Sequence, residues 1–204
     1  MTVRIAILVY DGFDLIDAGG PYEVFLTASR LQRREGLNPS FEVELVSPGG
    51  RDVTAFGGMT LTALGTAEDI VASDVVLVPG TIDVQPALAD DAVSRAVGSL
   101  VGAGTVVTSV CTGAFFLARD GLLSGLGATT HWEDLDALGA GHDVGAVVAD
   151  RRWVDEGGVV TSAGLTSGMH MALHLVERFA GADLAHATAR QLDMDFDPEG
   201  HRAV

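Results

Sequence analysis

The sequence predicts an α/β fold in which helices cover both faces of a mostly parallel sheet. Short, continuous apolar runs recur along the chain, as expected for strands that are buried on both faces. Stretches with apolar residues at helical spacing separate these runs, so strands and helices alternate. The chain has 204 residues, of which 48% are hydrophobic and 20% charged, and this composition suits a globular domain with a sizeable core.

The first half of the chain predicts strands and helices in turn. Val3 to Tyr10 is almost entirely apolar and too short for a typical helix, which indicates a buried strand. Gly20 to Arg34 has helical spacing, and Pro21 lies where a proline of the first helical turn would lie. The other predicted elements are the strand Phe41 to Val46, a weaker edge or hairpin strand at Met59 to Leu64, the buried strand Asp74 to Pro79 and the helix Asp91 to Val101.

The second half begins with the strand Thr105 to Val110, which runs directly into a helix at Thr112 to Arg119. The later elements are a short helix at His131 to Leu138, short strands at Val144 to Val148, Trp153 to Val154 and Val159 to Thr161, and helices at Thr166 to Phe179 and Asp183 to Leu192. No repeat or Pro-, Gly- or Ser-rich linker divides the chain. We therefore expect one domain at residues 1–192, followed by an acidic tail at residues 193–204.

Charge and cysteine content restrict the partners and the compartment. The chain has 28 acidic residues against 12 Lys and Arg, a net charge of −16, so we expect no nucleic acid and no anionic membrane as partner. It has neither a long apolar stretch nor a secretory signal pattern at its N-terminus. The single cysteine cannot form an intrachain disulfide and suits a reducing compartment. These features predict a soluble cytoplasmic protein.

Cys111 is the candidate nucleophile. It stands where an apolar strand ends and a helix begins, the layout of a nucleophile elbow with Cys in place of Ser. The N-terminus of the new helix is expected to lower the pKa of the thiol. Gly113 and Ala114 are small enough to pack closely under such a turn. The alternative is that Cys111 is a small buried hydrophobic residue, as free cysteines often are.

Two further strand ends carry residues that suit the same site. After the strand that ends at Val78, the turn at Gly80 and Thr81 offers a backbone N–H that would form an oxyanion pair with the N–H of Thr112. Taken alone, this segment is more typical of an ordinary turn between a strand and the following helix.

After the first strand, Asp17 lies in the expected loop and Glu23 on the expected helix. A carboxyl group beside a thiolate is pushed toward its protonated form, and can then serve as a general acid and later as a base. The alternative is that these are solvated surface acids, which is strongest for Asp11 and Asp14.

Histidines and glycines give weaker signals. His131 follows Cys111 by 20 residues and could be a base for the thiol, a helix cap or a packing residue. No HExxH pattern occurs, and one cysteine forms no zinc motif, so we expect no metal. No GxGxxG follows a strand and no Walker loop occurs, so we expect no nucleotide cofactor.

The chain resembles the ThiJ/PfpI superfamily in four segments, DAGGPYEVF, DVVLVPG, SVCTGAFFLARDGLLSGLGATTHW and TSAGLTSGMHMALHLVERFAG. Within it, the chain is similar to the branch of isonitrile hydratases and the sensor domains of AraC-type regulators, from the first strand to about Leu192. The resemblance implies a flavodoxin-like sandwich, usually a homodimer with active sites near the interface, and Cys111 as nucleophile. It also implies that Asp17, before GPYEVF, assists the cysteine and that Thr112, directly after it, is functional.

The resemblance also separates the branches of the superfamily. Peptidase-like members have His directly after the cysteine, where this chain has Thr112. Glyoxalase- and deglycase-like members usually have a Glu on the first helix, which Glu23 would match, although the GPYEVF context favours Asp17. The chain departs from many relatives at Thr81, where they have Gly, and at His170, where they have Asp.

The activity implied by the resemblance is hydration of an isonitrile to an N-substituted formamide by a cysteine-dependent hydro-lyase without a cofactor. Cys111, Asp17 and Thr112 would be catalytic, and the supporting residues would be Gly80, Thr81 and Gly20 around the oxyanion and substrate, with Glu23 and His131 as further candidates. The alternatives are a glyoxalase- or deglycase-like enzyme, or a cysteine-based redox or ligand sensor. For a DNA-binding regulator, we expect the segment after Leu192 to be too short.

Overall fold

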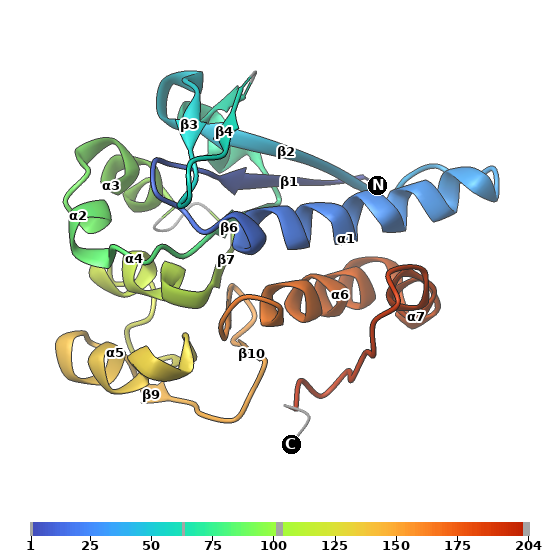
Figure 1. Ribbon diagram of the computed structural model, residues 1–204. Coiled ribbons are helices and arrows are strands. Elements are labelled where there is room, and N and C mark those ends of the chain that lie inside the picture. Colours follow the sequence, from blue (N-terminus) through green and yellow to red (C-terminus); the bar gives the residue numbers. More distant parts are fainter. Residues whose placement is uncertain (1, 63, 101–103, 202–204) are drawn as a thin grey trace.

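The computed structural model describes residues 2–62, 64–100 and 104–201 (Figure 1). A seven-stranded sheet with the order β10-β11-β7-β6-β1-β2-β5 forms its centre. Every neighbouring pair in this sheet is parallel except β10 and β11, which are antiparallel. The α/β prediction with a mostly parallel sheet is therefore confirmed.

The strands are short, and the central ones are buried. The last four residues of β1 and all four residues of β6 are buried, which explains their continuous apolar sequences. The strands of the main sheet are β1 (Val3–Leu8), β2 (Phe41–Ser47), β5 (Gly65–Thr66), β6 (Val75–Val78), β7 (Val106–Val110), β10 (Trp153–Asp155) and β11 (Val159–Ser162). Two further pairs lie outside it: β3 (Val53–Thr54) with β4 (Thr60–Leu61), and β8 (Gly127–Ala128) with β9 (Ala146–Val147).

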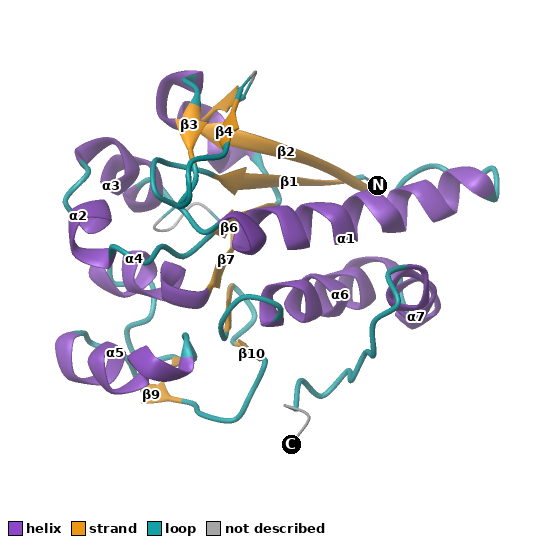
Figure 2. Cartoon of the chain, in the orientation of Figure 1, coloured by secondary structure: helices purple, strands orange, loops and turns teal. Residues whose placement is uncertain are grey.

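The helices form two groups around the sheet (Figure 2). One group consists of α1 (Leu15–Arg34), α6 (Ser167–Ala180) and α7 (Ala182–Gln191), which pack against one another. In the other, α4 (Ala114–Arg119) contacts each of α2 (Val84–Leu88), α3 (Asp91–Gly98) and α5 (Leu135–Gly141). None of the helices in the described ranges is long and apolar enough to cross a bilayer.

The first helix begins earlier than its sequence suggests. We expected it to start at Gly20 with Pro21 in its first turn, but α1 starts at Leu15 and Pro21 lies inside it. Gly20 lies inside the helix and lets α1 approach α6, because a Cβ there would lie 2.7 Å from Met169 Cγ. Asp17 consequently lies on the first turn of α1 and not in a loop.

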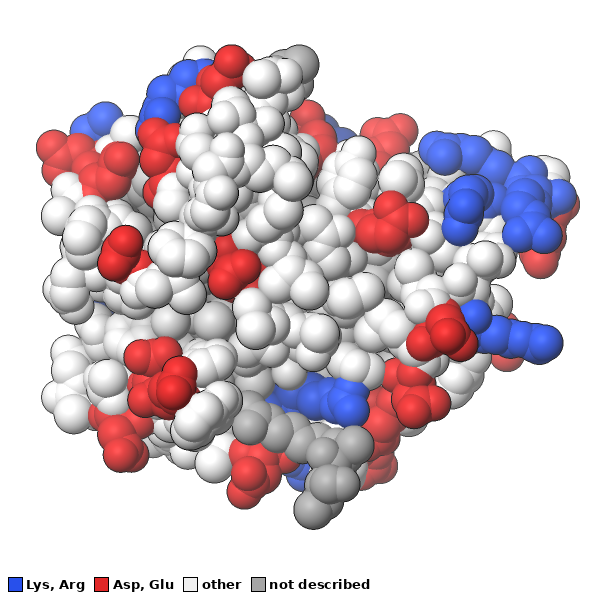
Figure 3. Space-filling model, viewed as in Figure 1, with Lys and Arg blue, Asp and Glu red and all other residues white. Residues whose placement is uncertain are grey.

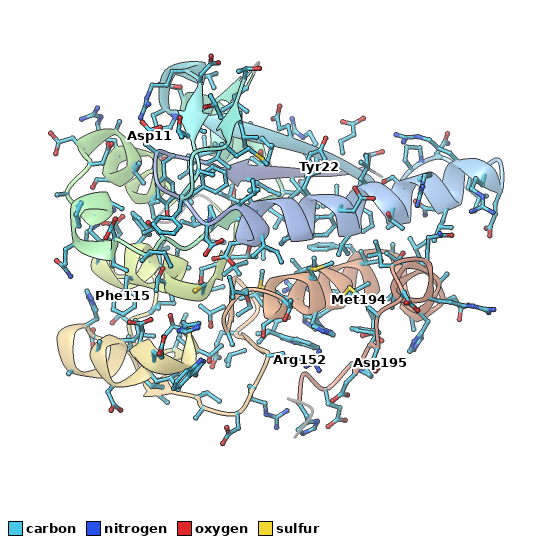
Figure 4. The ribbon with its side chains drawn as sticks, in the orientation of Figure 1. Asp11, Tyr22, Phe115, Arg152, Met194 and Asp195 are labelled. Carbon is cyan, nitrogen blue, oxygen red and sulfur yellow. The ribbon has the colours of Figure 1, made fainter. Side chains whose placement is uncertain are left out.

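The segment after α7 folds back onto the edge strand β10. The ring of Phe196 is stacked with that of Trp153, with centroids 6.5 Å apart, and Arg152 Nε donates a hydrogen bond to His201 O over 3.0 Å. Figure 4 shows Arg152 beside the segment that carries Met194 and Asp195. The predicted helix end at Val101 and the last three residues of the expected tail, 202–204, lie outside the described residues.

The junction of β7 with α4 packs directly against the end of β6. A Cβ on Gly113 would lie 2.3 Å from Val78 O and 3.1 Å from the carbonyl carbon of Pro79. Only glycine allows the chain after Cys111 to approach the neighbouring strand this closely. The expectation that a small residue is needed under the turn is thereby confirmed for Gly113.

We expect Gly113→Ala to lower the free energy of unfolding by about 2–4 kcal/mol, because the added methyl group meets backbone atoms that have little room to move. Urea unfolding measures this change. Gly141→Ala is the matched control, since nothing lies within 4 Å of a Cβ at that position. Equal stabilities of the two variants would contradict the close packing of the junction.

Candidate active site

Cys111 lies on a 3₁₀ turn, Cys111–Gly113, between β7 and α4, and its backbone is in the left-handed region with φ of 56°. This conformation costs a non-glycine residue about 1 kcal/mol or more, so the surroundings must hold it. The N–H of Cys111 donates to Ala163 O over 3.2 Å, and Thr130 Oγ1 donates to Cys111 O over 2.8 Å. The structure thus contains the strained strand-to-helix turn of a nucleophile elbow.

Asp17 lies beside this thiol and is fully buried. Its Oδ2 accepts a hydrogen bond from the N–H of Gly80 over 3.0 Å, and its carboxylate is also hydrogen-bonded to the side chain of Cys111. Its other oxygen, Oδ1, is buried and has no partner among the described residues. Burial raises the pKa of Asp17 to about 7, and the charge of Asp14 adds to this effect while the Gly80 and Cys111 hydrogen bonds oppose it.

The thiol does not behave as its place at a helix start suggests. Burial and the neighbouring charge of Asp17 raise the pKa of Cys111 to about 12, although the N–H groups of Thr112 and Leu165 hydrogen-bond to the sulfur and oppose the shift. The expected lowering of the thiol pKa is wrong, because desolvation and a like charge outweigh two backbone donors. Between pH 7 and 12 the pair therefore retains one proton.

The turn after β6 does not form the oxyanion pair that we expected. The N–H of Gly80 is occupied by Asp17, and the N–H of Thr81 donates to Thr112 Oγ1 over 2.8 Å. The Thr112 hydroxyl in turn donates to Thr81 O over 2.7 Å. A Cβ on Gly80 would lie 2.8 Å or less from Asp17 Oδ2 and Thr112 Oγ1, so Gly80 keeps these groups together.

The donors that face the sulfur are the N–H groups of Thr112 and Leu165. Leu165 has φ of 52°, a conformation that a leucine seldom adopts, so its sequence gives no signal for this role. Leu165 directly follows the TSAG segment. The parallel pairing of β11 with β7 brings this segment beside Cys111, and the sequence alone does not reveal that pairing.

A pocket of about 260 Å³ opens over Cys111. Five of its lining residues are ionisable and three others are apolar. The lining residues are Asp14, Thr81, Ile82, Val84, Cys111, Thr112, His131, Glu133, Asp134 and Leu165. Of the residues that line it, none is Lys or Arg, so the described walls carry three carboxylates and no fixed positive charge.

The basic residues lie elsewhere. Figure 3 shows Arg side chains gathered over the far end of α1, whose last turn carries Arg33 and Arg34. Asp14, which lines the pocket, precedes the other end of this 20-residue helix, about 30 Å away. We therefore expect a negative potential at the mouth of the pocket.

Four of the expected site residues do not line the pocket: Asp17 and Gly80, which are buried, and Gly20 and Glu23. Gly20 is packed against Met169 and serves the approach of α1 and α6. Glu23 is exposed on α1, where it accepts a hydrogen bond from Thr27 Oγ1 over 3.1 Å. By contrast, Asp14, which we weighed mainly as a surface acid, lines the pocket.

His170, at the position of one departure from relatives, is mostly buried and contacts Arg152, whose Nη1 donates to His170 Nε2. Burial and this guanidinium lower the pKa of His170 to about 4. The residue thus belongs to the contacts between α6, β10 and the C-terminal segment. On α4, Phe115 meets the ring of His142 edge-on at 5.7 Å between centroids.

Within the part of the chain that the structure describes, no group of three or more His, Cys, Asp or Glu side chains is arranged to hold a metal ion.

Residues 3–178 match the model of the DJ-1/PfpI family. Isonitrile hydratase from Pseudomonas putida is 33% identical over 193 residues, which cover 95% of this chain and 79% of that protein. The HTH-type transcriptional regulator GbdR from Pseudomonas aeruginosa is 31% identical over 183 residues, 90% of this chain, but the match spans only 48% of the regulator.

Solved structures show the same fold. A ThiJ/PfpI family protein from Pseudomonas syringae has a TM-score of 0.81 at 27% identity, and the match covers 97% of this chain and 77% of that one. DJ-1beta from Drosophila melanogaster has a TM-score of 0.79 at 18% identity, over 96% of this chain and 100% of that one.

We expect Asp17→Asn to stabilise the fold more at pH 8 than at pH 5. The pKa of Asp17 is about 7 in the folded chain against an ordinary 3.8, so folding favours the protonated form. The resulting stability is complete below about pH 4 and is lost as the pH rises to about 7. Asn is neutral throughout, so its advantage should grow across this window to about 2–4 kcal/mol.

Urea unfolding at the two pH values measures this difference. Glu42→Gln, which neutralises an exposed acid on β2, is the control and should show little dependence on pH. An Asp17→Asn advantage that is the same at both pH values would contradict the raised pKa of Asp17.

We expect a cationic methanethiosulfonate to modify Cys111 faster than an anionic one of similar size, by about tenfold at low salt after correction for a free small thiol. Cys111 is the sole cysteine of the chain, so the reaction reports on this pocket alone. The preference should shrink in Glu133→Gln and Asp134→Asn and with added salt, but not in Glu42→Gln. If the ratio of the cationic to the anionic reaction rate equals that of the free thiol, the result would contradict a negative potential at the mouth of the pocket.

Proposed function

This chain belongs to the DJ-1/PfpI family, and on that premise we propose that it is a cysteine-dependent isonitrile hydratase, which converts an isonitrile to an N-substituted formamide. The observation that carries the proposal is the pair of Cys111 and the buried Asp17, which share a hydrogen bond where Cys111 lines a small pocket. Such a pair supplies a nucleophile and a proton at one place, and isonitrile hydration needs both.

The first half-reaction adds the thiol across the isonitrile carbon. Asp17 takes the thiol proton as the sulfur bonds to the terminal carbon, and the same proton then passes from Asp17 to that carbon. The product is a thioimidate, Cys111–S–CH=N–R, which contains every atom of the thiol and of the isonitrile. The N–H groups of Thr112 and Leu165 stabilise negative charge on the sulfur while the proton is on Asp17.

The second half-reaction hydrolyses this adduct. Water adds to the thioimidate carbon, and the nitrogen gains a proton. Collapse of the tetrahedral adduct breaks the carbon–sulfur bond, forms the formamide carbonyl and returns a proton to the Cys111–Asp17 pair. The atoms balance as one isonitrile plus one water to one formamide, with the pair restored, and no cofactor enters the sequence of steps.

The geometry gives less support to three other activities. A glyoxalase or deglycase of the expected type uses a Glu on the first helix, but Glu23 is exposed and outside the pocket. A redox sensor requires a readily ionised thiol, whereas the pKa of Cys111 is about 12. A Cys–His peptidase requires His after the cysteine, and Thr112 occupies this position with its hydroxyl bonded to Thr81.

A ligand sensor is the second candidate. The observation that favours it is the 31% identity with the regulator GbdR across 90% of this chain, close to the identity with isonitrile hydratase. A sensor would bind a small molecule over Cys111 without turnover. Binding of an isonitrile or formamide without product formation would support this function and count against the hydratase.

We expect the purified protein to convert small alkyl isonitriles to formamides, which mass spectrometry quantifies. Cys111→Ala should reduce the rate to that of buffer, and Asp17→Asn should reduce kcat by at least about 100-fold, because the proton for the carbon is lost. Gly141→Ala, at a residue that does not line the pocket, should retain full activity. Consumption of methylglyoxal with formation of lactate, and no formamide from a panel of isonitriles, would reject the hydratase.

A further inference from the structure

The pocket over Cys111 has acidic walls for which the proposed chemistry has no use. Asp14, Glu133 and Asp134 line it, and none of them takes part in the proton transfers described above. These three carboxylates come from two distant segments of the chain. Asp14 directly precedes α1, whereas the other two lie on the 3₁₀ turn Trp132–Asp134. Two segments thus bring negative charge to one small cavity.

Two of these acids stand at helix N-termini without capping them. Asp14 is the N-cap residue of α1 and Asp134 is that of α5, yet neither side chain accepts a hydrogen bond from the helix that it precedes. An aspartate at this position ordinarily accepts one. Asp90 does so at the start of α3, from the N–H groups of Ala92 and Val93. The carboxylates of Asp14 and Asp134 therefore remain available to a ligand.

The described walls hold too little positive charge to balance these acids. No Lys or Arg is among the described lining residues, and the imidazole of His131 is the one lining group that can become cationic. Its Nδ1 lies 3.6 Å from a carboxylate oxygen of Glu133 and of Asp134. Even with this imidazole protonated, three carboxylates against one positive charge leave a net charge of −2. Coulomb attraction therefore favours a cation in this cavity over a neutral group of the same size.

The apolar part of the lining suits a short hydrocarbon chain. It consists of Ile82, Val84 and Leu165, and Leu165 also places its N–H on the nucleophilic sulfur. The cavity of about 260 Å³ is smaller than the roughly 300–1,000 Å³ of pockets for drug-sized ligands, which indicates a small substrate. The side chains of Glu133 and Asp134 are 62% and 36% exposed, so these acids lie toward the mouth.

Charge at this place also acts on the catalytic pair. Burial is the main cause of the raised pKa values of Asp17 and Cys111, and the charge of Asp14 adds to both. Asp14 is therefore close enough to the reacting groups to influence them. A cation bound to Asp14 would offset its charge and favour ionisation of the thiol while the substrate is in place.

We propose that the substrate of this pocket is an isonitrile with a protonated amine at the far end of a short aliphatic chain; this inference rests on the hydratase function proposed above. The isonitrile carbon meets the sulfur of Cys111, and the methylene groups pack on Ile82 and Leu165. The ammonium group donates hydrogen bonds to the carboxylates that line the cavity. The amine stays protonated throughout, so one isonitrile and one water give one N-(ω-ammonioalkyl)formamide by the steps already described.

The test compares two isonitriles of equal size that differ in charge. 3-Ammoniopropyl isonitrile has an ammonium group where n-butyl isonitrile has a methyl group. We expect kcat/KM of the wild type to be at least about tenfold higher for the cation at low salt, chiefly through a lower KM. In about 1 M salt the preference should fall to about twofold or less, because partly exposed charges are screened.

Neutral variants identify the carboxylates responsible. Glu133→Gln and Asp14→Asn should each lower the cation preference by about threefold, and combined with Asp134→Asn they should bring it to about one. Each preference is a ratio of two rates measured on the same variant, so a loss of folded protein cancels. Glu42→Gln, which neutralises an exposed acid outside the pocket, is the control and should keep the preference. The salt dependence of the wild type tests the same charge without any substitution.

The outcomes separate this inference from the function on which it rests. A wild type that converts neither isonitrile to a formamide overturns the hydratase and the cationic substrate together. Conversion of n-butyl isonitrile with no advantage for the cation overturns the cationic substrate alone. A cation preference that survives both high salt and the combined variant also overturns it, because the ammonium group would then be bound elsewhere.

Discussion

The buried hydrogen bond between Asp17 and Cys111 is the interaction on which the candidate site depends. A carboxylate without exposure to water is costly unless it is protonated or hydrogen-bonded, and Asp17 has only the N–H of Gly80 and the thiol as partners in the described structure. The charge of Asp17 raises the pKa of Cys111, whereas the hydrogen bond from Cys111 lowers the pKa of Asp17 and so opposes the effect of burial. The outcome is a pair that holds one proton between about pH 7 and pH 12.

The parallel sheet makes this pair possible. Strands β1, β6 and β7 are neighbours, so their carboxyl ends deliver three segments to one edge: the start of α1 with Asp17, the turn at Gly80, and the elbow at Cys111. Gly113 lets the elbow pack on Val78, and the Thr112 hydroxyl locks it to Thr81. The residues that we expected to bind the substrate oxyanion thus hold the three segments together.

Much of the fold and part of the site could be predicted from the sequence. Buried parallel strands have continuous apolar sequences, so the ends of β1, β6 and β7 were predicted to within two residues, and the elbow followed from the end of β7. The predicted start of α1 was wrong because Pro21 and Gly20 resemble a helix start, whereas in the structure both lie inside the helix and Gly20 allows close packing on Met169. Leu165 and Asp14 were missed or undervalued because their roles arise from backbone conformation and strand pairing, which residue type does not encode.

The raised thiol pKa is the most informative of these differences. A cysteine that attacks an electrophile such as an ester benefits from a preformed thiolate, and a helix start with a nearby base provides one. An isonitrile carbon instead acquires a sulfur and a hydrogen in the same half-reaction. A site that stabilised the thiolate and discarded its proton would have to recruit another, whereas a buried pair with one shared proton delivers both. The desolvation that opposes ionisation of Cys111 is therefore suited to this addition. Of the many acidic residues of the protein, the buried Asp17 is the one that takes part in it.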